Sequence, residues 1–162
     1  MARERARINL IVDRLIEKLE EIDGDETEWL TAPRTVRRFR GTDDLDVAMP
    51  AILIRLMPGT TGNVMGSSAG GEWRTEREII LCALTKDTDD PQAEVSDLGA
   101  DVRKALRALG GTLLADDGTT QLAFGVKETA NDMEIDPDLA GAGFAADIVT
   151  VSLTYQTTAD NP

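Results

Sequence analysis

The chain has 162 residues, a formal net charge of −13, one cysteine and no histidine. This length suits a single domain, residues 1–162, with a full hydrophobic core. The lone Cys82 excludes an internal disulfide. Without histidine, the chain cannot build a Ser-His-Asp or Cys-His relay, or a zinc site with several His or Cys ligands. The excess of acidic over basic residues opposes binding of free nucleic acid, because such binding requires basic groups that neutralise the phosphates.

The start of the chain is charged and has no long apolar stretch, so we expect no secretory signal. No run of about 18 apolar residues occurs, so we expect no membrane span. The first predicted element is an amphipathic helix over roughly residues 4–21, because apolar residues recur at spacings of three and four. Gly24 is placed to end this helix. The apolar positions are Ile8, Ile11, Val12, Leu15, Ile16, Leu19 and Ile22.

The charges of this helix oppose its macrodipole, which favours acids at the start and bases at the end. Two interpretations are open: the helix ends are simply solvated, or they meet oppositely charged partners such as neighbouring copies. Such departures from a local rule are worth following as functional signals. The residues concerned are Arg3, Arg5 and Arg7 at the start, and Glu17, Glu20 and Glu21 near the end.

A short edge-like strand is predicted around Val36 and Phe39, where arginines are interleaved. Residues 51–57, bounded by prolines, predict a buried strand. The arginine patch can contact nucleic acid or an acidic protein surface. The net charge of the chain favours an acidic neighbour, including a second copy. The patch consists of Arg34, Arg37, Arg38 and Arg40.

Residues 58–71 contain five glycines and fit no regular element. The segment is either a passive loop or the flexible tip, residues 58–72, of an extended hairpin arm. The next strand, residues 72–84, alternates in its first half and is apolar on both faces in its second half, so one end is predicted to project from the core. Trp73, Arg74 and Arg77 fall on the arm, and Cys82 in the apolar half is a small core residue.

A second helix is predicted from the N-cap Asp90 and Pro91 to the stop at Gly110. Gly99 inside it costs about 1 kcal/mol relative to alanine unless a close contact requires glycine. The helix buries one apolar face, formed by Val95, Leu98, Val102, Leu106 and Leu109.

Two further strands are predicted, one by the alternation of Leu122, Phe124 and Val126 and one over residues 145–158. Alternate side chains of the last strand are expected to form two rows, one facing the core and one facing outward. Residues 159–162 are expected to be loose. The inward row is Val149, Val151, Leu153 and Tyr155, and the outward row is Thr150, Ser152, Thr154 and Gln156.

Together these elements predict an α+β fold. We expect a mixed, mostly antiparallel sheet of about five strands, with two helices packed on one face and a long protruding hairpin arm. No catalytic, cofactor-binding or metal-binding residue is predicted.

Two acidic clusters are weak candidates for a metal or acid/base site. The first lacks the glycine and closing glutamate of an EF-hand loop, and no second motif supports acid/base chemistry at the other. A solvated helix cap and a solvated acidic face are the favoured interpretations. The clusters are Asp87, Asp89 and Asp90, and Asp132, Glu134, Asp136 and Asp138.

The order of these segments resembles the tail terminator (tail completion or minor tail) proteins of tailed bacteriophages. The resemblance covers most of the chain but depends on order and short phrases. These are the first helix INLIVDRLIEKLEEI, then TVRRF, PAILIRLM, REIILCALT, the second helix VSDLGADVRKAL with LGG, the connector start ETANDMEI and the final strand ADIVTVSLTY.

The resemblance implies a non-enzymatic virion protein at the head-proximal end of the tail, assembled in the host cytoplasm. Members of this family form a ring, typically a hexamer, on the last ring of the tail tube. There they end tube polymerisation and present a surface to the head-side connector. DNA passes through the ring without specific binding, and no membrane is involved. The family has no catalytic residues, so the resemblance assigns none to this chain.

For this role we expect subunit or tube contacts through the arginine patch, the arm and the ends of the first helix. Two alternatives remain: a head-tail connector or neck protein, and an acidic protein-binding module that mimics DNA. A metal-dependent enzyme ranks third. The expected contact residues are Arg34, Arg37, Arg38, Arg40, Trp73, Arg74, Arg77, Arg3, Arg5, Glu20 and Glu21.

Overall fold

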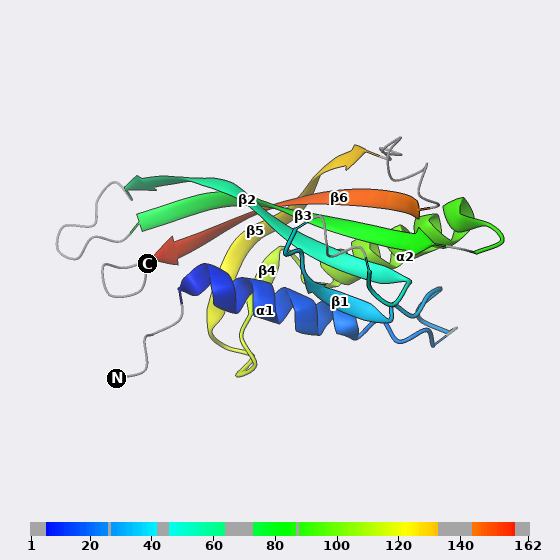
Figure 1. Cartoon of the computed structure of the whole chain (residues 1–162). Helices are drawn as coiled ribbons and strands as arrows, with labels where there is room; N and C mark the ends of the chain where they lie inside the picture. The colour runs from blue at the N-terminus through cyan, green and yellow to red at the C-terminus, as the bar shows by residue number, and fades with distance from the viewer. Residues whose placement is uncertain are drawn as a thin grey trace.

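The computed structural model describes residues 6–25, 27–41, 46–63, 73–86, 88–132 and 144–157. Two helices and six strands occur in these ranges (Figure 1). The helices are α1 (Arg7–Glu20) and α2 (Pro91–Ala108), and the strands are β1 (Thr35–Arg38), β2 (Ala51–Asn63), β3 (Trp73–Lys86), β4 (Thr112–Leu114), β5 (Gln121–Asp132) and β6 (Phe144–Thr157).

The six strands form one sheet in the order β1-β2-β3-β6-β5-β4. β1 and β2 are parallel, whereas all other neighbours are antiparallel. The predicted α+β class and mixed, mostly antiparallel sheet are therefore confirmed. The expectation of about five strands missed β4, because its three residues, 112–114, are too few to show a period-two pattern.

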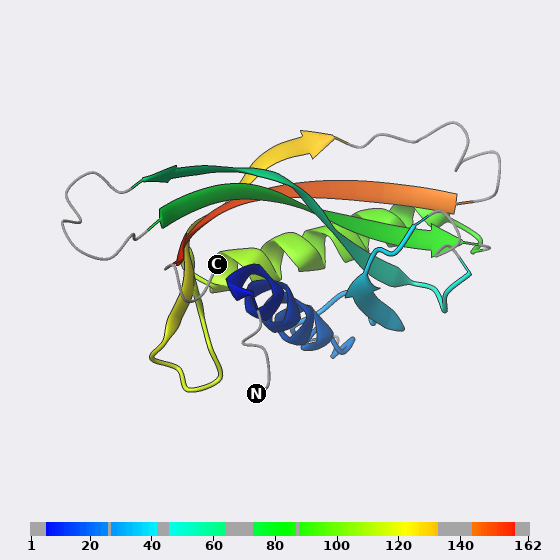
Figure 2. The same cartoon turned by 60° about the vertical axis from the view of Figure 1, so that its left-hand side comes forward.

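Both helices lie against the same face of the sheet, side by side beneath the long strands (Figures 1 and 2). We call this the helix face, and the opposite side the outer face. The apolar side of each helix and the inward rows of the strands form one core. Burying each large side chain stabilises the fold by about 1.5–3 kcal/mol. Fully buried members include Ile11, Leu15, Leu19, Ile52, Ile79, Leu81 and Leu98.

α2 begins and ends where its sequence predicts. The Asp90 side chain accepts a hydrogen bond from the backbone nitrogen of Ala93 at 3.1 Å. Pro91 occupies the first turn. Gly110 has a φ of 63°, a left-handed conformation that glycine adopts without strain and that ends the helix.

The inward row of β6 is confirmed, and the outward row lies on the outer face; within it Ser152 and Thr154 are buried, whereas Gln156 is exposed. Ser152 and Thr154 are only 9% and 5% exposed. β6 lies between β3 and β5, and Thr154 is opposite Glu76 on one side and Phe124 on the other. The longer neighbouring side chains flank these short hydroxyl groups, so they are shielded without being covered by a helix.

The hairpin differs from the predicted projecting arm. β2 does not end at Met57 but continues to Asn63, opposite Trp73. β3 also pairs there with β6, with Trp73 opposite Thr157, and Thr75 is buried. The described end of the hairpin is thus part of a three-stranded section of sheet. Pro58 is accommodated because it falls at a bulge between Leu56 and Gly59 on the sheet margin.

Several sequence predictions lie outside the described residues. They are the arm tip at residues 64–72, the acidic residues Asp87, Glu134, Asp136 and Asp138, and the last residues 158–162.

A buried ion pair joins α2 to the centre of the sheet. The guanidinium of Arg103 donates two parallel hydrogen bonds of 2.9 Å to the carboxylate of Asp147 on β6. Its Nε donates to Glu128 on β5 at 3.1 Å. Asp147 is only 1% exposed. The hydrogen bond to Asp147 is the main cause that raises the pKa of Arg103, so the guanidinium stays charged.

A second buried carboxylate anchors the segment between α1 and β1. Asp101 of α2 accepts hydrogen bonds from the backbone nitrogens of Leu30 and Thr31, at 2.9 and 2.8 Å. It also accepts one from the Thr31 hydroxyl at 2.7 Å. The charge of Asp101 is thereby compensated although the residue is buried.

Gly99 has the close contact that its place inside a helix requires. A Cβ at this position would lie 1.9 Å from Oδ2 of Asp147 and 3.0 Å from Nη1 of Arg103. α2 therefore approaches β6 closely enough to form the ion pair only because residue 99 has no side chain.

We predict that Gly99→Ala destabilises the protein by about 3 kcal/mol, because the added methyl displaces Asp147 from Arg103. Urea unfolding followed by circular dichroism measures the change. The matched control is Ala100→Gly at the neighbouring exposed position, which should lose about 1 kcal/mol through helix propensity alone. A Gly99→Ala variant as stable as the parent would show that the close approach is not needed.

Candidate functional site

The predicted arginine patch does not form a single surface. Successive side chains of a strand point to opposite faces, so Arg37 and Arg38 of β1 diverge. Arg38 turns to the helix face and donates to Asn9 Oδ1 at 2.7 Å and to Asp13 Oδ1 at 2.8 Å. It also bonds the Asn9 carbonyl at 2.8 Å. Arg38 therefore holds α1 against β1 and is occupied within its own chain.

The other three arginines of the patch differ in how far their side chains are exposed. Arg37 is half-buried and turns to the outer face. Arg34 and Arg40 are exposed at the two ends of β1. An assembly contact through this region would therefore involve the exposed Arg34 more readily than Arg38.

The outer face carries charged side chains over a small apolar cluster. On β3 it presents Glu76 and Glu78, both exposed, and Arg55 of β2 lies on the same face. Toward the other end of the strands, Leu53, Leu84 and Ala146 are buried, and Phe39, Met49 and Cys82 pack against them partly buried. This face therefore carries an apolar cluster toward one end of the strands and charged side chains toward the other.

Cys82 belongs to this outer cluster and not to the main core. Desolvation, followed by the charge of Asp147, raises its pKa to about 11. Because the thiolate and not the thiol is the nucleophile, Cys82 is unreactive near neutral pH.

The three predicted arm residues lie in different environments. Trp73 is 40% exposed at the end of the sheet. Arg74 is exposed on the outer face, with its guanidinium 5.1 Å from the centre of the Phe124 ring. Arg77 is half-buried on the helix face and lies against Gly59. Trp73 and Arg74 are thus available for contact, whereas Arg77 packs within the chain.

Contacts within the chain at the two ends of α1 account for part of its unusual charge pattern. Arg7 donates from Nε to the carbonyl of Leu122 at 3.4 Å and also bonds the carbonyl of Gln121, so it ties the helix start to β5. Glu21 pairs with Lys18 at 2.6 Å. Glu20 is exposed, whereas Arg3 and Arg5 lie outside the described residues.

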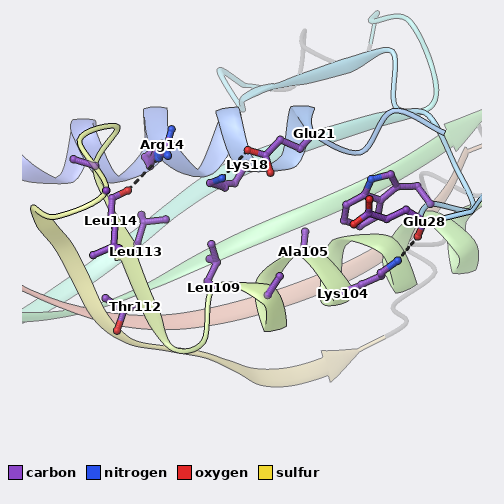
Figure 3. Close-up of a pocket in the computed structure, with 14 residues that line it drawn as sticks. Arg14, Lys18, Glu21, Glu28, Lys104, Ala105, Leu109, Thr112, Leu113 and Leu114 are labelled. Atoms are coloured by element: carbon purple, nitrogen blue, oxygen red, sulfur yellow. Dashed lines mark hydrogen bonds and ion pairs between the residues drawn. The ribbon is translucent and has the colours of Figure 1, made fainter. Parts of the chain in front are cut away.

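A groove of about 360 Å³ runs between α1, α2 and β4 (Figure 3). Lys104 lies 4.7 Å from the centre of the Trp29 ring and also bonds the carbonyl of Glu28. Arg14 donates to the carbonyl of Leu114 at 3.0 Å. These basic groups therefore already have partners in the chain, so the groove offers an apolar floor and a neutralised rim. Ala105, Leu109 and Leu113 line it as well.

Among the described residues, no group of three or more His, Cys, Asp or Glu side chains is placed to hold a metal ion. None of the helices in the described ranges is long and apolar enough to cross a membrane. The sequence matches no protein-family model, and a search of curated proteins finds no match either.

We predict that Arg38→Ala lowers stability by about 1–2 kcal/mol, since it removes charge-assisted hydrogen bonds that join β1 to α1 and are partly screened by solvent. Arg34→Ala, on the exposed end of the same strand, should change stability by less than about 0.5 kcal/mol. Thermal and urea unfolding measure both. Equal losses in the two variants would contradict the separate roles assigned to these arginines.

Proposed function

We propose that this protein is a tail terminator of a tailed bacteriophage or a related tail-like element. In this role, copies of the chain form a ring on the last ring of the tail tube. The ring ends tube polymerisation and offers an attachment surface to a head-side connector. The protein acts by binding and shape, as a component of the virion, and not by catalysis.

The observation that carries this proposal is the one-sided sheet. Both helices cover the helix face, while the outer face keeps a partly exposed apolar cluster around Phe39 and Met49. Charged residues such as Glu76 and Glu78 lie farther along the same face. Protein–protein interfaces combine an apolar core with a polar rim, and this face offers an apolar cluster beside charged groups. The outer face is therefore suited to contact other protein subunits.

The order of elements supports the same proposal. A first helix, three strands, a second helix and three further strands follow one another, an order compatible with the family that the sequence resembles. In the proposed assembly, the β2–β3 hairpin extends toward the tube or a neighbouring copy, with Trp73 at its described end. An exposed tryptophan can contribute strongly to binding because it buries a large area on contact.

The net charge of −13 suits a ring through which DNA passes. Binding to DNA gains most of its sequence-independent affinity from neutralising phosphates with basic groups. A strongly acidic ring gives little of this attraction, so DNA moving through it is not retained.

We predict that the protein, mixed with purified tail tubes that lack a terminator, forms rings at one tube end. Negative-stain imaging and light scattering after size exclusion measure this. A chain that remains monomeric at every concentration, with and without tubes, contradicts the proposal. Binding to portal-side proteins in place of tubes would assign the chain to the head-tail connectors.

The outer face can be tested in the same assay. Glu76→Lys with Glu78→Lys should leave the circular dichroism spectrum unchanged but weaken assembly at least tenfold, because it reverses the charge at the contact surface. The control, Asp89→Lys with Asp97→Lys, changes the net charge equally at exposed sites near α2. If both variants weaken assembly alike, the effect is one of total charge and not of the outer face.

A further inference from the structure

The sheet has two partly open margins. On one side, β1 pairs only with residues Ala51–Ile54 of β2. Within the part of the chain that the structure describes, the rest of β2 pairs with β3 alone. On the other side, β4 pairs only with the first residues of β5, through Phe124. Val126 still donates to the Gly111 carbonyl. Residues 127–132 pair with β6 alone among the described strands, with a register irregularity between Glu128 and Ala130.

Unpaired strand edges are normally blocked, since their free N–H and C=O groups can accept another strand. On β2 such blocking features are the exposed Arg55, Pro58 and the bulge beside Pro58, all between Ile54 and Gly59. Beyond them, residues 59–63 contain glycine, threonine and asparagine and carry no charge. This section is regular β-strand as far as Asn63. It is therefore an extended edge without electrostatic protection.

The two open sections are placed to meet in a head-to-tail arrangement. β2 and β5 lie on opposite sides of the sheet. β2 is antiparallel to β3, β3 to β6, and β6 to β5, so β5 runs antiparallel to β2. A second copy placed beside the first in the same orientation brings its β5 against the β2 of the first in the antiparallel sense. Antiparallel pairing is slightly more stable per residue than parallel pairing.

The short edge strands do not obstruct this pairing. β1 covers the end of β2 that lies opposite Leu81–Leu84 of β3. β4 covers the other end of the sheet, near the Phe124–Thr154 pair. Because they lie at opposite ends of the strands, the open sections are diagonal to each other. A shift of the second copy along the strand direction, by about five residues or about 16 Å, aligns them.

We propose that copies of this chain join by adding the β5 section at residues 127–132 of one copy to the β2 section at residues 59–63 of the next. The partner is thus a second copy, and the contact is a continuous intermolecular sheet. Each copy uses two different edges, and such a heterologous contact closes into a ring when the rotation between copies allows it. This inference rests on the proposed ring function and assigns its subunit interface.

Cysteine cross-linking tests the pairing directly. In a Cys82→Ala background, Thr60→Cys or Thr61→Cys is placed on β2, and Lys127→Cys or Thr129→Cys on β5. Each β2 variant is mixed with each β5 variant on tail tubes and mildly oxidised. We expect at least one mixture to give a disulfide-linked dimer on a non-reducing gel. The corresponding double variant should give a ladder of bands that ends at the ring size.

A matched control is Asp97→Cys, an exposed position on α2 away from both strand edges. It should cross-link at background level in every mixture. Cross-linking of Thr60→Cys or Thr61→Cys copies to themselves would indicate two-fold pairing between β2 edges and overturn the proposal. Rings that form on tubes with no mixed cross-link above the control would overturn this interface alone. Absence of any assembly would overturn the proposed function together with the interface.

Discussion

The fold depends on the buried ion pair between Arg103 of α2 and Asp147 of β6. A carboxylate that is 1% exposed is stable there only because a guanidinium meets it with two hydrogen bonds. β6 is central in the sheet, so the pair sets the distance and the side at which α2 packs. Gly99 permits this distance, and Glu128 extends the network to β5.

With α2 held on the helix face, two further contacts position β1 and α1. Asp101 binds the segment at Leu30 and Thr31 and so directs the chain from α1 to β1. Arg38 then joins β1 back to α1. Both helices are thereby used on one side of the sheet. The outer face and the open strand sections remain for contacts with other molecules, which is the physical basis of the proposed assembly.

Residues that looked equivalent in the sequence have unlike roles in the structure. The four arginines around β1 read as one patch, yet the alternation of the strand turns Arg38 inward to a structural contact. Arg77 is likewise packed, whereas its neighbour Arg74 lies exposed against Phe124. The buried roles of Asp101 and Asp147 gave no sequence signal, because their partners lie 70–71 and 44 residues away along the chain. Gly99 was the one local hint of this contact.

The sequence by itself determined both helices, the short strand β1, the four longer strands or their central parts, the cap at Asp90 and the inward row of β6. These features depend on the local period of apolar residues and on capping groups, which act over a few positions. Only the tertiary structure decided the sheet order, the short strand β4, the extension of β2 to Asn63 and the shielding of Ser152 and Thr154. Each of these depends on pairing with a strand distant in the chain, and the identity of that partner is not encoded in any local pattern.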